Sequence, residues 1–542
     1  MSNKTSSAWD EVPNIILKKL NNLCIRNYTI IFSNCTNNGY YPDIWKTAKL
    51  IVINKKPDQP TELDNLRPIS MLPCISKIYE RLIKNNILKF NNKHNIIPEH
   101  QFGFREGHST IHAIQKLTAD INWEFNRGNM TGAILVDLQK AFDSVWHHGL
   151  LFKLIKNNMD PHLLKLTYNL ITNRKFKLTN NDTTNNNKTF TITKGLQQGT
   201  VNSPFLFNLY TADVTKSYGI NKNTTNALTF ADDLILYTSN NNMKTIEKNL
   251  QSIYNRIVKL YKDWKLKVNP SKCETILFRN NIREEKHHTQ KNWRNFQIKD
   301  IINNTVIPHK RQVKYLGIIF DDLLRFNIHV KLQLKKASNA FKTLHNLFYT
   351  PHLGSKAKII CYQCLIRPLL TYGCPIWYNM SVSAMEKLRL FERKILRACL
   401  NKYRTAESNY KKRINNFKIL EMAMLPRIDT FIIYLIRNYI RQAISNKSNS
   451  LIFGPYYHNN LYLINALERG KAPPEAFKFL DDNHLIIDDD LKHCLFHIPR
   501  NNWNKSLPLS IFNKNYVYCR KLTSYDEELI AKFKYYVKEK KN

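Results

Sequence analysis

The sequence predicts an α+β fold that continues into a mainly helical region. Short apolar segments such as 133–138 and 228–237 have the lengths and the residue types of strands. Amphipathic segments such as 245–264 have the periodicity of helices and alternate with the strands. From residue 327 onward the pattern is helical, in segments near 327–349, 354–371, 382–400 and 415–447.

Length and charge narrow the range of functions. A chain of 542 residues exceeds one compact core and predicts about two to four domains. Lys and Arg number 82 against 42 Asp and Glu, and the net charge of +40 is spread along the whole length, as in proteins that handle nucleic acid. An anionic membrane surface is the competing partner, but the sequence shows no basic amphipathic anchor, signal-peptide core or long uncharged apolar run. The 10 scattered cysteines indicate a reducing compartment.

The sequence pattern of the N-terminal part predicts a helix, a strand and a cationic loop. The helix occupies the first 35 residues, and the strand 48–53 ends shortly before Lys55. Lys55 and Arg67, which lies in the polar loop that follows, could hold a polyphosphate, although an ordinary solvated loop has the same composition. The expected apolar face of the helix consists of Ile15, Ile16, Leu17, Leu20 and Leu23.

Two glycine-bearing loops each lead into a predicted helix, in a chain that has only 14 glycines. The first, residues 101–110, offers Ser109 or Thr110 as a helix cap and Arg105 as a contact for a phosphate backbone. The second, residues 195–204, allows the backbone to approach a ligand closely through its glycines.

Carboxylates at the ends of predicted strands are the main functional signal. Asp137 ends the apolar strand 133–138, which we expect to be buried on both faces, and Asp232 and Asp233 lie at the tip of a tight hairpin. An ordinary polar turn is one interpretation of the Asp pair, and neutralisation by a divalent cation is the other. If the strands lie side by side, Asp137 joins the pair in the ligand set of two-metal phosphoryl transfer.

The cysteines of the second half are interpreted as core residues. Cys361 and Cys364 form a CxxC in an apolar helical stretch, with Cys374 and Cys399 downstream. A zinc site is the alternative, but buried cysteine is ordinary in such a helix, so we expect core packing.

The chain from residue 4 to about residue 400 resembles the reverse transcriptase of non-LTR retrotransposons, in particular the jockey-like insect elements. A lone Ala-Asp-Asp is common by chance, whereas eight blocks in the order of the family are specific. One departure is Ala8, which stands where a glycine is usual. The blocks are residues 4–14, 65–70, 101–110, 136–144, 195–204, 230–233, 269–272 and 315–317.

The resemblance implies a role for each residue that matches a family motif. Asp137, Asp232 and Asp233 would bind two Mg²⁺ ions, with Mn²⁺ as a possible substitute. Phe142 would exclude a 2′ hydroxyl and so select dNTP over NTP, although a core aromatic is its ordinary interpretation. Arg67 and Lys55 would hold the triphosphate, and Gln198 and Gly199 would line the nucleotide pocket. Lys272 would protonate the pyrophosphate leaving group, although an ordinary surface lysine is the other interpretation.

The resemblance also implies the architecture of a right-hand polymerase, with fingers, a palm and a helical thumb. The palm would be an antiparallel sheet with helices on one face, residues 315–317 would grip the primer, and the basic thumb would hold the template–primer duplex. The expected parts are an N-terminal helical extension (1–35), a reverse transcriptase domain of fingers and palm (36–320), a helical thumb (321–447) and a basic C-terminal region of unknown role (448–542).

The implied activity is RNA-directed DNA polymerisation, the two-metal transfer of dNTPs onto a primer 3′-OH on an RNA template. Expected partners are the RNA template, a DNA primer or target and dNTPs, without a membrane, and the expected location is intracellular, the nucleus with a cytoplasmic phase. Two alternatives stay open: an inactive or domesticated remnant that binds RNA or DNA, and an organellar intron maturase. Since no endonuclease precedes the first block, we expect a polymerase-only product, a truncated copy or a fragment of a longer frame.

Overall fold

The computed structural model describes residues 8–55, 62, 65–178, 189–216, 225–279, 296–302, 304–377, 382–402, 414–429, 431–432, 435, 438–439 and 442. Among these residues the strands are β1 (Thr47–Asn54), β2 (Leu66–Met71), β3 (Met130–Val136), β4 (Leu138–Gln139), β5 (Arg174–Leu178), β6 (Thr189–Ile192), β7 (Thr225–Phe230), β8 (Asp233–Asn240), β9 (Lys267–Val268), β10 (Glu274–Phe278), β11 (Ile298–Asp300), β12 (Thr305–Ile307), β13 (Gln312–Tyr315) and β14 (Ile318–Asp321).

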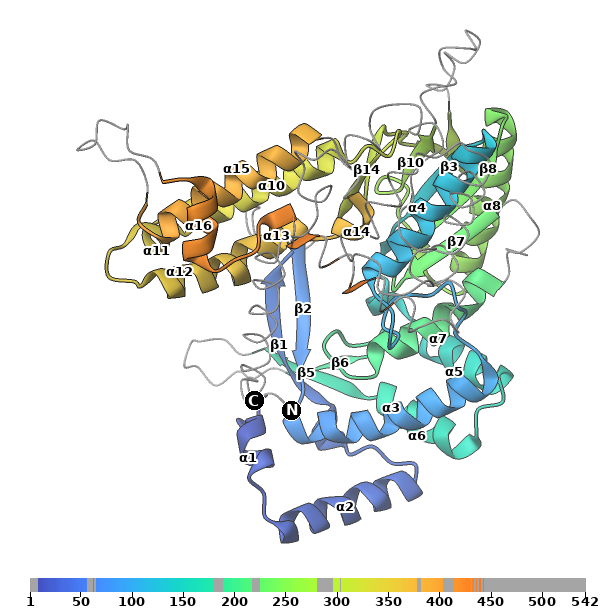
Figure 1. Ribbon diagram of the computed structural model, residues 1–542. Coiled ribbons are helices and arrows are strands. Elements are labelled where there is room, and N and C mark those ends of the chain that lie inside the picture. The colour runs from blue at the N-terminus through green and yellow to red at the C-terminus, as the bar shows by residue number, and fades with distance from the viewer. Residues whose placement is uncertain are drawn as a thin grey trace.

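The helices of the described residues include each helical segment that the sequence predicts before residue 400. They are α1 (Asn14–Lys18), α2 (Asn22–Asn37), α3 (Cys74–His94), α4 (Thr110–Arg127), α5 (His147–Lys156), α6 (Pro161–Ile171), α7 (Ser203–Lys216), α8 (Met243–Asp263), α10 (Asn327–Thr343), α11 (His345–Tyr349), α12 (Ser355–Cys361), α13 (Arg367–Thr371), α14 (Cys374–Trp377), α15 (Val382–Cys399) and α16 (Asn416–Ala423), with the short turns η1 (Asp43–Lys46), η3 (Phe142–Ser144) and η5 (Tyr362–Ile366). The α+β class with a helical second part is therefore confirmed, and Figure 1 shows α10, α12 and α16 gathered around α15.

The sheet that carries the predicted carboxylates is antiparallel, with the order β10-β3-β8-β7. Apolar side chains leave its central strands on both faces: Ala133 and Ile235 pack in the core that contains α4, whereas Ile134 and Leu236 pack in the core that contains α8. Figure 1 shows α4 and α8 on either side of β3 and β8. The prediction of helices on one face is wrong, because a strand that is apolar on both faces must be covered on both.

A second four-stranded sheet has the order β2-β1-β5-β6, and a buried ion pair lies beneath it. Nη2 of Arg174 in β5 donates to Oε1 of Glu80 in α3 at 2.9 Å. The other carboxylate oxygen of Glu80 accepts from the backbone N–H of Val201 at 2.8 Å, and Arg174 also donates to Oε1 of Gln197 at 3.3 Å. Because Glu80 and Arg174 are both buried, this pair anchors the glycine loop 195–204 from behind.

The N-terminal helical segment is confirmed as two helices, α1 and α2, but its predicted apolar face is wrong. Ile15, Ile16 and Leu23 are exposed. The inner face of α2 is formed instead by Phe32, whose ring stacks on Tyr79 of α3 with the centroids 5.3 Å apart. The orientation of α2 is therefore set by aromatic packing further along the helix.

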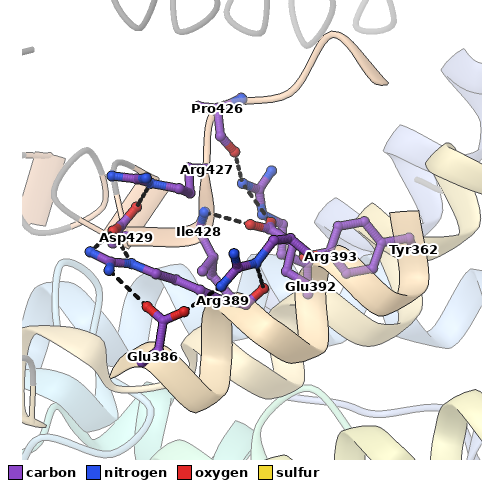
Figure 2. A network of polar contacts seen from close by, with 10 residues as sticks. Tyr362, Glu386, Arg389, Glu392, Arg393, Pro426, Arg427, Ile428 and Asp429 are labelled. Carbon is purple, nitrogen blue, oxygen red and sulfur yellow. Dashed lines mark hydrogen bonds and ion pairs between the residues drawn. The ribbon is translucent and has the colours of Figure 1, made fainter. Parts of the chain in front are cut away.

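The helical second part is held together by a network of buried charges, shown in Figure 2. Glu392 of α15 accepts from the hydroxyl of Tyr362 at 2.8 Å and from the backbone N–H of Ile428 at 2.7 Å. Asp429 accepts from Nε of Arg389 at 2.6 Å and from Nε of Arg427 at 3.0 Å. Since Glu392 and Asp429 are fully buried, these contacts fix the segment 426–429 on α15.

The cysteine predictions are confirmed in part. Cys374 and Cys399 are buried, but Cys364 is exposed and Cys361 only half-buried. Because Tyr362 and Ile366 occupy the inner side of the π-helical turn η5, Cys364 between them points outward. None of the described helices has the combined length and apolarity of a membrane span. The C-terminal region 448–542 lies outside the described residues.

Breaking the Glu80–Arg174 pair should destabilise the protein strongly. Arg174→Met leaves the Glu80 carboxylate buried without its cation, and we expect a loss of about 3–5 kcal/mol in the free energy of unfolding, measured by urea denaturation. Arg127→Gln is the control, because Arg127 is largely exposed in its pair with Glu124 and its loss should cost about 0–1 kcal/mol. Equal losses for the two variants would contradict this role.

Candidate active site

A tight hairpin between β7 and β8 presents Asp232 and Asp233. Phe230 pairs with Asp233 across the ladder, so only Ala231 and Asp232 form the turn. Ala231 has a φ of 59°, the left-handed conformation that a non-glycine residue adopts only when its surroundings require it. The predicted hairpin is confirmed, and both aspartate side chains are accessible to solvent at its tip.

Strand register brings Asp137 to the same edge of the sheet. The antiparallel ladder between β3 and β8 ends with Val136 opposite Leu234. Asp137 and Asp233 are the next residues on each strand, so they lie across from each other at the end of the ladder. The structure thus brings together the three carboxylates that the sequence assigns to one site.

In the absence of a cation, the pKa values of all three carboxylates lie above their ordinary values, chiefly because the groups lose solvation. Burial, Asp232 and Asp137 together raise the pKa of Asp233 to about 6, against the opposing effect of Lys314. Burial also raises the pKa of Asp137; Lys272 opposes this shift, and Asp232 adds to it. The pKa of Asp232 is raised by burial as well. A divalent cation would relieve this repulsion.

Cationic side chains from four separate segments face the carboxylates. Arg67 of β2 lowers the pKa of Asp232, whereas Lys55, just after β1, and Lys272 lower that of Asp137. Lys314 of β13 acts on Asp233 in the same way. Three of these residues are predicted from the sequence, and Lys314 is not.

Lys272 is positioned by a turn that is tied to Asp137. The backbone N–H of Asn269 donates to the carbonyl of Asp137 at 2.8 Å, and the N–H of Lys272 donates to the carbonyl of Asn269 at 3.1 Å. The N–H of Asp137 in turn donates to Sγ of the buried Cys273 at 3.5 Å. The lysine therefore keeps a fixed backbone position relative to the carboxylate.

Phe142, Gln198 and Gly199 lie on two segments that are joined by hydrogen bonds. Nε2 of Gln198 donates to Oδ1 of Asp143 at 3.3 Å, and the half-buried ring of Phe142 stacks on Phe207 with the centroids 4.6 Å apart. Gly199 has a φ of 103°, and a Cβ there would meet the carbonyl oxygen of Ser70 at 2.8 Å. A glycine is therefore required where this loop crosses β2.

Residues 53–320, which carry all of these groups, match the family model described as reverse transcriptase (RNA-dependent DNA polymerase). They belong to the reverse transcriptase family. The right-hand polymerase fold that the sequence resemblance implies is thereby confirmed for this segment.

Relatives of this reverse transcriptase domain occur in non-LTR retrotransposons, as the sequence predicts. The chain is 29% identical over 398 residues to the RNA-directed DNA polymerase from mobile element jockey of Drosophila funebris, covering 73% of this chain and 42% of the relative. It is 30% identical over 400 residues to the probable RNA-directed DNA polymerase from transposon BS of Drosophila melanogaster, covering 73% and 43%. The chain thus spans less than half the length of these relatives.

Solved structures with some likeness to the chain include telomerases. The telomerase from Candida albicans, solved in complex with a fragment of telomeric RNA, is 12% identical with a TM-score of 0.37, and the likeness covers 79% of this chain and 64% of that one. The truncated apo telomerase from Candida tropicalis is 14% identical with a TM-score of 0.36, covering 52% and 54%.

The donor chemistry of the reverse transcriptase site fits a divalent cation. Carboxylate oxygens are the ligands that Mg²⁺ and Mn²⁺ prefer. Among the described residues, no group of three or more His, Cys, Asp or Glu side chains is already arranged to hold an ion.

The loop 101–110 confirms one sequence prediction, the cap of α4, and differs from the sequence interpretation at Arg105 and Gln101. Ser109 caps α4 as predicted, with its hydroxyl accepting from the N–H of His112 at 3.4 Å. Arg105, predicted to contact phosphate, instead donates from Nη1 to the carbonyls of Pro98 and Gln101 at 3.0 and 3.2 Å. Gln101, for which the sequence alone predicts no role, hydrogen-bonds to the aspartate hairpin. A polar residue two positions before a glycine, in a chain with only 14 glycines, is the signal that could have indicated it.

Removing one charge from the triad should stabilise the protein when no divalent cation is present. The pKa of Asp233 is about 6 in the folded protein and near 3.8 in the unfolded chain, so the protonated carboxyl favours folding at low pH. This stabilisation is lost as the pH rises from about 3.8 through about 6. At pH 7.5 in a chelator, Asp233→Asn should therefore raise the unfolding temperature by about 2 °C. The gain should shrink at pH 5, where the wild-type carboxyl is largely protonated. A lower unfolding temperature for the variant at pH 7.5 would show that the repulsion is absent.

Proposed function

We propose that this chain is the RNA-directed DNA polymerase of a non-LTR retrotransposon, transferring dNTPs onto a primer 3′-OH on an RNA template. The observation that carries the proposal is the placement of Asp137, Asp232 and Asp233 at one sheet edge, surrounded by cations, in a reverse transcriptase domain. Because the chain spans less than half of its relatives, their further activities are not assigned to it.

Each residue of the site has a defined task in this reaction. Asp137, Asp232 and Asp233 would hold Mg²⁺, which when bound lowers the pKa of the primer 3′-OH and stabilises the transition state. Arg67 of β2 and Lys55, just after β1, act on the carboxylates and would hold the triphosphate in line with the primer.

The other residues select the sugar and assist the leaving group. The ring of Phe142 would lie under the incoming sugar and leave no room for a 2′ hydroxyl, while Gln198 and Gly199 form the facing wall. Lys272, fixed beside Asp137, would donate a proton to the departing pyrophosphate.

The helical thumb offers a cationic surface for the template–primer duplex. Lys331, Lys335 and Lys342 are exposed on α10 and lie four and seven residues apart, which places them on one side of the helix. Such a row suits the phosphate backbone of an RNA–DNA hybrid, which is recognised through its shape and charge. Neither a domesticated remnant nor an intron maturase is favoured by a specific observation.

Primer extension tests the polymerase assignment. The purified protein should extend oligo(dT) on poly(rA) with dTTP and Mg²⁺, and changing the three aspartates to alanine should lower the rate about 1,000-fold or more. Asp263→Ala, at the exposed end of α8, is the control and should leave the rate unchanged. Tight, salt-dependent RNA binding without incorporation by the wild type would support the remnant instead.

Shortening Phe142 tests the sugar filter. Phe142→Val opens space beneath the sugar, and we expect the ratio of rNTP to dNTP incorporation efficiency to rise about 10-fold or more, because a pocket that loses a steric clash gains that order of tolerance. Phe207→Leu, which alters the ring behind Phe142, is the comparison and should change the ratio less. An unchanged ratio for Phe142→Val would assign the ring to core packing alone.

A further inference from the structure

A loop that is distant in sequence extends the sheet beside the aspartate hairpin. The backbone N–H of Thr229 in β7 donates to the carbonyl of His100 at 3.0 Å, and the N–H of Phe102 donates to the carbonyl of Thr229 at 2.8 Å. These bonds form a parallel bridge between Gln101 and Thr229, two residues before the turn. The loop therefore runs alongside the last residues of β7.

The side chain of Gln101 binds the turn itself. It is 3% exposed, and its Oε1 accepts from the backbone N–H of Ala231 at 3.0 Å and from that of Gly103 at 2.9 Å. Its Nε2 donates to the carbonyl of Ala231 at 3.4 Å. One amide group thus binds both backbone polar groups of Ala231, the residue in the left-handed conformation.

The same loop is held from its other side by the helix that begins at the glycine loop 195–204. Nδ2 of Asn208 in α7, 1% exposed, donates to the carbonyl of Gly103 at 2.8 Å. A Cβ at Gly103 would lie 2.3 Å from the backbone nitrogen of Ala231, so the loop and the turn are in direct contact. Asn208, Gly103 and Gln101 therefore form a continuous path from α7 to the aspartate turn.

We propose that Gln101 is a positioning residue that holds Ala231 in its left-handed conformation and so sets where the Asp232 and Asp233 carboxylates stand relative to Asp137. The inference rests on the proposed function of these carboxylates as cation ligands. A residue in the left-handed region returns readily to an extended conformation when its hydrogen bonds are lost, and that change would swing the two side chains away from Asp137. Gln101 itself touches neither substrate nor cation.

Direct Mn²⁺ binding, measured by electron paramagnetic resonance, is the primary test. Gln101→Met keeps the length of the side chain but removes the amide, and the dissociation constant for Mn²⁺ should rise about tenfold. Gln115→Met is the matched control: Gln115 is also buried, and its Oε1 accepts no hydrogen bond among the described residues. Its Mn²⁺ affinity should stay within about twofold of the wild type.

A double variant separates positioning from a general loss of structure. Glycine adopts the left-handed conformation without support, so Gln101→Met should weaken Mn²⁺ binding less in an Ala231→Gly background than in the wild type. A merely structural role predicts the same loss in both backgrounds. If Gln101→Met does not fold, Asn208→Leu, which releases Gly103 from α7, should weaken Mn²⁺ binding in a folded protein, and an unchanged affinity would contradict the proposal.

Primer extension on the same variants distinguishes this inference from the proposed function. Gln101→Met should raise the Mg²⁺ concentration for half-maximal activity while KM for dTTP changes less. If Gln101→Met binds Mn²⁺ as tightly as a wild type that extends primers, the positioning role is overturned and the polymerase assignment stands. If the wild type neither binds Mn²⁺ nor extends primers, the proposed function fails and the positioning role with it.

Discussion

Repulsion among three carboxylates is the constraint on which this site depends. Register between β3 and β8 leaves Asp137 opposite Asp233, and the turn adds Asp232 beside them. Such an arrangement opposes folding unless positive charge compensates it, and burial together with Asp232 and Asp137 raises the pKa of Asp233. The surrounding structure compensates it with four cationic side chains and leaves the carboxylates accessible for a divalent ion.

The rest of the domain keeps these groups in place through buried polar contacts. Glu80 and Arg174 anchor the glycine loop from behind, and Gln101 holds the aspartate turn from the side. Buried polar groups that are fully hydrogen-bonded specify one arrangement of the backbone, at the price of stability that apolar packing would supply. The helical second part shows the same design in its network around Glu392, where buried charges pair with one another and with backbone groups.

Local patterns carried most of the fold and part of the site. The aspartate hairpin and the strand that ends at Asp137 each depend on a short local pattern of residues, so the sequence predicts them directly. Gln101 acts across 130 residues of chain, and Lys314 reaches Asp233 from a later hairpin, so neither has a local signal. The sequence-based prediction of which side chains are exposed fails for a related reason. Cys364 lies in an apolar stretch, but the π-helical turn directs its side chain outward. The packing of Phe32 against Tyr79 determines which face of α2 is buried.

A structure of the protein with an RNA template, a DNA primer, an incoming dNTP and Mn²⁺ tests the central claim most directly, because the anomalous signal of Mn²⁺ locates the ion without reference to activity. An ion bound by carboxylate oxygens of Asp137 and of at least one of Asp232 and Asp233, at about 2.0–2.6 Å, together with phosphate oxygens of the nucleotide, is the predicted result. An ion bound elsewhere, or a nucleotide that sits away from these carboxylates, would contradict the account.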